Sequence, residues 1–537
     1  MTDVRSRTAV VVDPDVRGAG IDLAALVGSL RDLGTGPAML VPGLAGHPER
    51  LAGAVKGSGA RGAVVVTAQF ERPRVSELRT WGAGAGLDPL GVQVVALDIL
   101  RARRSPTERS AYAVRMVRAA AAALDTTGAA PAVRRPAGAA LSRRALLSGR
   151  MTTWAPVVEV HVGTCVGTSR CGRCVTACPQ DALQVRQDLL GAPPVVDVSR
   201  CEACSRCLDV CPTGALLLEG HDPGSLAQRL QALLQGGDGA VAPALVIACQ
   251  AAVEPLHRLG EGSGLPGWLV LELPCLGGVG SAWHLAALAA GARSVQVLPC
   301  ARCMDRVTLT GEVRFTRDLL TALGDVDAAR RVGVLPVRGP QLQRAVLAAK
   351  GLTALVDGPG AYAMPAPGAG ETPALLTTRV AAWAVAELRR ALRRSVQDPH
   401  RGLPMVRGQG APLGVLRAAA EGCTACGVCV RTCPTGALSL SAGLGSTELV
   451  LDPAACNGCG LCVQTCPESV LDVARGVDLD LLVRGRVPIA RVALGVCPDC
   501  GETVPALPAA AQLTLLSAGL AERCPQCRQS ALVAQPR

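Results

Sequence analysis

Cysteines at short, repeated intervals are the residues of this sequence that can do chemistry. The chain has 24 of them in 537 residues. Two segments, 165–212 and 423–467, each contain two cysteine-rich runs, and a proline directly follows the last cysteine of every run. A shift of 255 positions lays the first segment on the second without a gap. Two residues between cysteines let one tight loop supply three thiolates to a metal cluster, while a fourth comes from elsewhere.

The four runs resemble those of the bacterial two-cluster ferredoxins, in which the fourth cysteine of each run ligates the other cluster. The resemblance implies four 4Fe-4S clusters. Their expected ligands are Cys165, Cys171, Cys174 and Cys211 for cluster 1; Cys201, Cys204, Cys207 and Cys178 for cluster 2; Cys423, Cys426, Cys429 and Cys466 for cluster 3; and Cys456, Cys459, Cys462 and Cys433 for cluster 4. Structural zinc or disulfides are the alternative, but they would suit a single CxxC pair better than four complete runs.

The first run departs from this pattern at its first cysteine. The repeat predicts a cysteine at Thr168, whereas the nearest one is Cys165, three residues earlier and followed by VGTSR. We expect this loop to bulge so that Cys165 still binds. The alternative is that one iron of cluster 1 is weakly ligated, so that the cluster can lose it and become a three-iron cluster.

Four further cysteines follow apolar segments in the middle of the chain. ALVIAC ends at Cys249, WLVLELPC at Cys275 and SVQVLPC at Cys300, with Cys303 one CxxC step beyond. Because the carboxyl ends of parallel strands lie along one edge of a sheet, we expect these four sulfurs to converge there. A 2Fe-2S cluster is the predicted occupant, and zinc on the same thiols is the alternative.

Two knuckles, CPDC and CPQC, stand near the end of the sequence. Their spacing predicts a zinc-ribbon-like site at Cys497, Cys500, Cys524 and Cys527. Such a site would close a small domain that is too short for its own core. A rubredoxin-like iron is the alternative metal.

The segments around these cysteines predict an α/β multidomain protein. Short β-branched runs alternate with helical spacing over residues 8–125, which is typical of a parallel sheet. RGAGIDL lacks the third glycine of a dinucleotide fingerprint, so we interpret it as a turn. The expected divisions are an α/β domain at 1–125, a linker at 126–150, a two-cluster ferredoxin (α+β) module at 151–220, a parallel α/β iron-sulfur domain at 240–355, a linker and helix at 356–415, a second ferredoxin module at 416–475 and the zinc-ribbon-like domain at 490–537.

Two longer stretches resemble known redox proteins. Residues 249–303, followed by TRDLLTALG and VGVLPVRGPQLQRAVLAA, resemble the delta subunit of methyl-viologen-reducing hydrogenase, an iron-sulfur protein that passes electrons to heterodisulfide reductase. GAVVVTAQF and AGLDPLGVQVVALDIL resemble the N-terminal domain of the flavin-containing subunit of heterodisulfide reductase. The extra cysteines of the delta subunit and the flavin domain of heterodisulfide reductase are missing here. Flavin-based electron bifurcation is therefore not implied.

The charge and the apolar segments of the sequence indicate which partners and which location to expect. The formal charge is +11 with thiols counted as neutral. Six metal sites with four thiolates each carry about −2 apiece, so the loaded protein is near neutral and we expect no nucleic-acid partner. No apolar run reaches the length of a membrane span. The start, MTDVRSRTAVVVDPD, does not resemble a signal peptide, and we expect a cytoplasmic protein.

Redox metal is the only chemistry that the sequence supports in quantity. Its six histidines are not at ligand spacing, and it has neither a P-loop nor a nucleophile elbow. We expect a non-catalytic electron-transfer subunit of an oxidoreductase complex. Its partners would be a hydrogenase, formate dehydrogenase or flavoprotein, and a heterodisulfide-reductase-type acceptor. The alternatives are a redox sensor or assembly protein, and a reductase whose substrate binds an open iron near Cys165.

Overall fold

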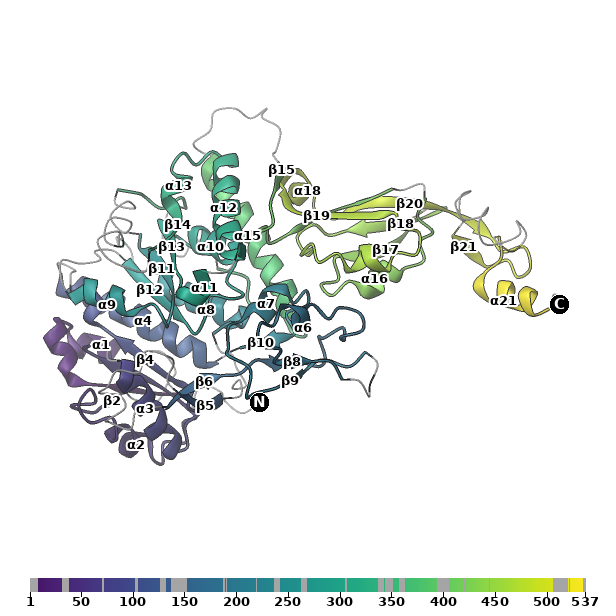
Figure 1. Ribbon diagram of the computed structural model, residues 1–537. Helices are drawn as coiled ribbons and strands as arrows, with labels where there is room; N and C mark the ends of the chain where they lie inside the picture. The colour runs from purple at the N-terminus through teal and green to yellow at the C-terminus, as the bar shows by residue number, and fades with distance from the viewer. Residues whose placement is uncertain are drawn as a thin grey trace.

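The fold is a mixed α/β arrangement in which two parallel sheets lie beside two ferredoxin-type modules (Figure 1). The computed structural model describes residues 8–30, 38–69, 72–101, 105–125, 132–136, 152–186, 189, 191–218, 220–235, 242–261, 268–304, 307–336, 342, 351–356, 363–393, 405–419, 422–443, 445–505, 520 and 522–534. Within these ranges no helix combines the length and apolar character that crossing a bilayer requires.

The N-terminal sheet is parallel throughout, with the strand order β2-β1-β3-β4. Its strands are β1 (Thr8–Val12), β2 (Met39–Leu40), β3 (Gly62–Thr67) and β4 (Val92–Ala96). The helices around it are α1 (Leu23–Leu30), α2 (Arg50–Val55), α3 (Arg72–Gly84) and α4 (Pro106–Asp125), with 3-10 turns η2 (Pro14–Ala19) and η4 (Asp98–Leu100). Runs of valine favour such strands because both faces of the sheet are covered. The predicted parallel architecture is confirmed here.

The central sheet is also parallel, with the order β12-β11-β13-β14. Its strands are β11 (Ala244–Cys249), β12 (Trp268–Leu273), β13 (Ser294–Leu298) and β14 (Val332–Val334), and its helices are α9 (Glu254–Glu261), α10 (Ser281–Ala289), α11 (Ala301–Met304), α12 (Val307–Ala322) and α13 (Ala328–Arg331). The three apolar runs that end in cysteine are therefore neighbouring strands, as predicted. A long helix, α15 (Pro373–Arg393), packs against α10.

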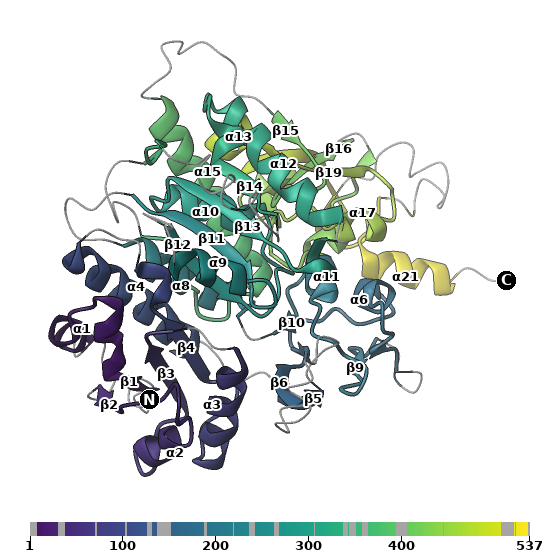
Figure 2. The ribbon, with the colours of Figure 1, turned by 60° about the vertical axis from the view of Figure 1, so that its left-hand side comes forward.

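The two α/β parts share one hydrophobic core. Helix α4 lies against α8 (Pro223–Leu234), and Tyr112 of the first belongs to the same buried cluster as Leu230 of the second. Figure 2 shows the N-terminal sheet on one side of this helix pair and the central sheet on the other. A buried histidine adds a polar link, because His257 Nδ1 lies 2.7 Å from Asp98 Oδ1 and Nε2 lies 3.1 Å from Glu272 Oε1.

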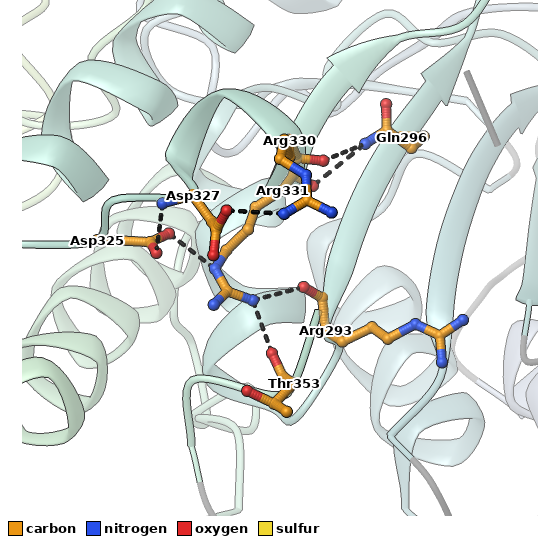
Figure 3. A network of polar contacts seen from close by, with 7 residues as sticks. All are labelled: Arg293, Gln296, Asp325, Asp327, Arg330, Arg331 and Thr353. Atoms are coloured by element: carbon orange, nitrogen blue, oxygen red, sulfur yellow. Dashed lines mark hydrogen bonds and ion pairs between the residues drawn. The ribbon is translucent and has the colours of Figure 1, made fainter. Parts of the chain in front are cut away.

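A buried ion pair stabilises the amino-terminal edge of the central sheet (Figure 3). Arg331 Nε donates to Asp325 Oδ2 at 2.7 Å, and both side chains are almost fully buried. The same guanidinium donates to the carbonyl oxygens of Arg293 and Thr353 at 2.8 and 2.7 Å. Since Arg293 directly precedes β13 and Thr353 follows β14 in the chain, the network links these two segments.

Short strands and helices build the two ferredoxin modules. The first has β7 (Glu159–Val160) paired with β10 (Leu216–Leu217), β8 (Leu183–Gln184) paired with β9 (Val195–Val196), and helices α6 (Arg173–Ala177) and α7 (Arg206–Val210). The second has β16 (Gly414–Ala418) paired with β19 (Leu471–Asp478), β17 (Leu438–Gly443) paired with β18 (Ser446–Leu451), and helices α16 (Val428–Thr432) and α17 (Leu461–Thr465). Each module thus repeats one strand–helix–strand unit twice.

Additional strands extend the modules. Within the segment expected to be a linker, β5 (Ala132–Pro136) pairs with β6 (Thr152–Pro156). The second module is preceded by β15 (Met405–Arg407), which pairs with β19, and it continues into α18 (Leu479–Arg484), β20 (Val487–Val496), β21 (Thr503–Pro505) and α21 (Pro525–Ala534). Strand β20 carries the chain to the last two elements, at the right of Figure 1.

Candidate metal centres

Each cysteine run turns through a left-handed residue directly before its short helix. These residues are Gly172, Ser205, Gly427 and Gly460, with φ between 58° and 77°. Glycine adopts this conformation without steric cost, whereas a residue with a Cβ atom pays about 1–2 kcal/mol. Ser205 is thus the one member of this set that departs from the locally preferred residue.

Three of the expected cysteine sets each line a cavity of their own. The sets are Cys165, Cys171, Cys174 and Cys211; Cys423, Cys426, Cys429 and Cys466; and Cys433, Cys456, Cys459 and Cys462. In the remaining set, burial raises the pKa of Cys207, and the nearby thiols of Cys204, Cys201 and Cys178, together with Cys174 of the neighbouring set, raise it further. The structure therefore brings together the cysteines that the resemblance grouped.

The bulge at the first run brings Cys165 to its cavity. The chain between Cys165 and Cys171 turns at Gly167, whose φ is 86°. Thr168 stands where the repeat predicts a cysteine. Its N–H and its hydroxyl both donate to the carbonyl oxygen of Ala192, at 3.0 and 3.1 Å. Because Thr168 is anchored to the opposite loop, the cysteine three residues earlier stands beside Cys171, Cys174 and Cys211.

The chemistry of these donor sets fits iron-sulfur clusters. Burial raises the pKa of Cys174 to about 11 and that of Cys462 to about 12, and neighbouring thiols add to both shifts. Four neighbouring thiolates that are partly removed from water are stabilised by a positively charged metal centre among them. Backbone N–H groups also point at sulfur, from Ala182 to Cys178, Ala215 to Cys211 and Ala437 to Cys433, at 3.2–3.3 Å. Such hydrogen bonds tune the potential of cluster thiolates.

The four central cysteines converge at the carboxyl edge of their sheet. The sulfurs of Cys249, Cys300 and Cys303 lie within 4.8 Å of one another, and Cys275 Sγ is 3.7 Å from Cys303 Sγ. A hydrogen bond with Cys303 lowers the pKa of Cys275 to about 6, although burial acts in the opposite direction. The set offers four sulfurs to a metal, which is what the strand-end pattern predicted. We call it the central centre.

The last four cysteines also form a compact set. The sulfurs of Cys497, Cys500, Cys524 and Cys527 lie within 4.8 Å of one another. Cys497 follows β20 and Cys524 precedes α21, so this set links the two ends of the small C-terminal segment. In a zinc site with Zn–S bonds of about 2.3 Å, tetrahedral sulfurs are about 3.8 Å apart. The separation of 3.7 Å between Cys500 and Cys524 matches that value.

Contacts between cysteine loops link the parts of the molecule. At the first contact, Cys275 Sγ lies 3.3 Å from the carbonyl oxygen of Cys204, and Gly278 N–H donates to Asp209 Oδ1 at 2.6 Å. We call this the central junction. No sequence pattern predicts it, because the residues that meet there are more than sixty positions apart.

A second contact joins the two ferredoxin modules. Arg173 donates from a guanidinium nitrogen to the carbonyl oxygen of Cys459 at 2.6 Å, and Asn457 Nδ2 donates to the carbonyl oxygen of Pro212 at the same distance. We call this the module junction. It places the loop of cluster 1 against the loop of cluster 4. Sequence reasoning missed both Arg173 and Asn457, since neither is part of a ligand pattern.

A large cavity lies where both modules meet the central domain. Its volume is about 1370 Å³. Cys171 and Cys459 both line it, together with Arg173 and Arg475. Surrounding protein lowers the pKa of Arg475 by desolvation. Residues from the loops of clusters 1 and 4 therefore line one and the same cavity.

Comparison with known proteins identifies the modules. Residues 155–215 and 422–470 each match the 4Fe-4S dicluster domain. The chain therefore contains two such domains, where the cysteine runs predicted them. No curated protein matches the chain.

Proposed function

We propose that this protein is an iron-sulfur electron-transfer subunit of an oxidoreductase complex, with four 4Fe-4S clusters and a 2Fe-2S cluster at the central centre. The observation that carries this proposal is the continuity of the cysteine loops. The central junction joins the central centre to the loop of cluster 2, and the module junction joins the loop of cluster 1 to that of cluster 4. The two loops of one module are adjacent within its fold.

The chemistry that bound clusters would supply is the transfer of single electrons, with no proton or other reactant required. The protein holds each set of thiols in a compact loop, directs N–H groups at three of the sulfurs and keeps successive loops in contact. Cys426 is exposed, so the loop of cluster 3 is accessible from outside the chain. These features support a path that leads from the central centre, through the modules, to a surface near cluster 3.

The proposed partners are redox proteins. A hydrogenase, formate dehydrogenase or flavoprotein would exchange electrons with one end of the path, and a heterodisulfide-reductase-type protein with the other. The C-terminal set is proposed to hold zinc, which has no redox chemistry and would fix the last segment.

The experiment is an electron count on protein purified without oxygen. Iron, sulfide and zinc are measured first, and the protein is then titrated with a reduced viologen. We expect five electrons per chain to enter reversibly, because each iron-sulfur cluster takes one. Reversible uptake of fewer than three would refute the relay.

Two cysteine variants sharpen this count. Cys429→Ser, in cluster 3, should lower the number of electrons and the iron content. Cys497→Ser, in the C-terminal set, should remove zinc and leave the electron count unchanged. Loss of an electron from the second variant would instead assign iron to that set.

A further inference from the structure

The central junction contains a serine with no evident structural purpose. Ser205 is 1% exposed, and its hydroxyl makes no hydrogen bond of ordinary geometry to any of the described atoms. A buried hydroxyl without a partner costs free energy, so its presence needs an explanation. Its backbone adds a further cost, because Ser205 has φ 58° where the other three loops have glycine.

The position of this hydroxyl supplies the explanation. It lies in the turn that packs against the loop of Cys275, because the backbone of Gly277, two residues after Cys275, approaches Ser205 closely. The sulfur of Cys275 also lies against the carbonyl oxygen of Cys204, the residue that precedes Ser205. A hydroxyl can rotate toward an acceptor, and a metal-bound thiolate is a better acceptor than a thiol.

The backbone of the facing turn is shaped to admit the serine. A Cβ atom at Gly277 would stand 2.3 Å from Ser205 Cβ and 2.8 Å from its carbonyl oxygen. No side chain larger than hydrogen fits there without separating the two loops. The turn is held from the other side as well, since His221 Nε2 lies 2.5 Å from the carbonyl oxygen of Cys275.

We propose that Ser205 is a positioning residue that couples the central centre to the loop of cluster 2, by donating its hydroxyl hydrogen to the metal-bound sulfur of Cys275. This inference rests on the proposed function, because it requires iron at the central centre. A hydrogen bond to a cluster sulfur stabilises the more negative, reduced form. Ser205 therefore raises the potential of the central centre and fixes its contact with the neighbouring loop.

The test uses the full chain with its clusters loaded. Ser205→Gly removes the hydroxyl and also relieves the left-handed strain, and Ser205→Ala removes the hydroxyl alone. The matched control is Ser294→Ala, which removes another buried hydroxyl without a partner from the opposite edge of the central sheet. Iron and sulfide content are measured for each variant before its potentials are measured by spectroscopic redox titration.

Both Ser205 variants should keep their iron and shift the midpoint potential of the central centre downward. Loss of one hydrogen bond to a charged group should change the partition of an electron between the central centre and cluster 2 by about tenfold. For a one-electron couple this is about 59 mV. An unchanged potential in both variants, or an equal shift in Ser294→Ala, would overturn the proposal.

A second measurement examines the contact itself. Gly277→Ala should separate the loops and abolish the magnetic interaction between the reduced central centre and reduced cluster 2 in electron paramagnetic resonance spectra. Gly311→Ala is its control, since an added Cβ there meets no atom closer than 4.0 Å. Persistence of the interaction in Gly277→Ala would contradict the proposed coupling.

The outcomes separate this proposal from the proposed function. Zinc at the central centre, with the four clusters of the modules intact, would overturn the coupling through Ser205 while leaving electron transfer through the modules standing. Failure of the modules to accept electrons would remove the proposed function itself.

Discussion

The module junction allows a quantitative prediction at Arg173. Replacing Arg173 by methionine keeps most of the side-chain volume but removes the charged donor that contacts the Cys459 carbonyl oxygen at 2.6 Å. Hydrogen bonds to charged groups contribute about 1.5–3 kcal/mol, so the contact between the modules should weaken by that order. Burial raises the pKa of the Cys459 thiol, and the positive charge of Arg173 opposes that rise because it stabilises negative charge near the sulfur.

The potential of cluster 4 should therefore fall in Arg173→Met. At an effective dielectric constant of about 20, a nearby unit charge contributes about 1–2 kcal/mol, which is on the order of 40–90 mV for a one-electron couple. The assay is a redox titration of the loaded protein followed by electron paramagnetic resonance. Arg417→Met is the control, because it removes the same charge from an exposed position of strand β16. Equal potentials in the two variants, at equal iron content, would refute the reasoning.

Three other predictions concern stability and ligation. Burial opposes protonation of His257, but its hydrogen bonds to Asp98 and Glu272 raise its pKa to about 9. Since the folded value exceeds the unfolded value of about 6.5, the stabilisation, about 3 kcal/mol, is complete below pH 6.5 and is lost as the pH rises through 9. Melting temperatures measured from pH 6 to 9.5 should show this fall, and His257→Gln should flatten it. Arg331→Met should cost about 3–5 kcal/mol, because it leaves Asp325 as a buried charge without its cation; denaturant unfolding would measure the loss, and a cost below 1 kcal/mol would contradict the role of the ion pair. Cys165→Ala should lower the iron content of cluster 1, and unchanged iron and sulfide would remove Cys165 from the ligands.

Much of the fold follows from local sequence signals. Valine-rich runs are sufficient to identify β1, β3 and the strands of the central sheet, because parallel strands are buried on both faces. Cysteine spacing is sufficient to group three thiols of each set, since one loop can supply three of them, whereas the fourth is assigned from the resemblance to two-cluster ferredoxins. The sequence predicts a helix within residues 356–415 but does not fix its first residue. Thr372, whose hydroxyl accepts from the N–H of Leu375, together with Pro373 at the first helical position, marks the true beginning.

The parts that escaped prediction depend on contacts between distant segments. The apolar face of helix α4 indicates that this face is buried. The sequence of α4 does not predict, however, that α8 is the helix against which it packs. Arg173 and Asn457 belong to no repeated pattern, because each donates to a backbone carbonyl whose residue type is irrelevant to the contact. Ser205 is different. It stands where the three equivalent loops have glycine, so alignment of the four runs within this one sequence marks it as an exception.

The central sheet separates the residues that stabilise it from the residues that hold metal. The Arg331 network occupies the end at which β13 and β14 begin, whereas the cysteines follow the carboxyl ends of β11, β12 and β13. Strand β13 has five residues and therefore spans about 17 Å. Changes at sites more than about 10 Å apart that share no partner act additively. Weakening the Arg331 network should therefore lower stability without altering the potential of the central centre, whereas removal of Ser205 should do the reverse. If both changes moved both properties, the two ends of the sheet would have to be mechanically coupled, and the hydroxyl of Ser205 would no longer account for the potential.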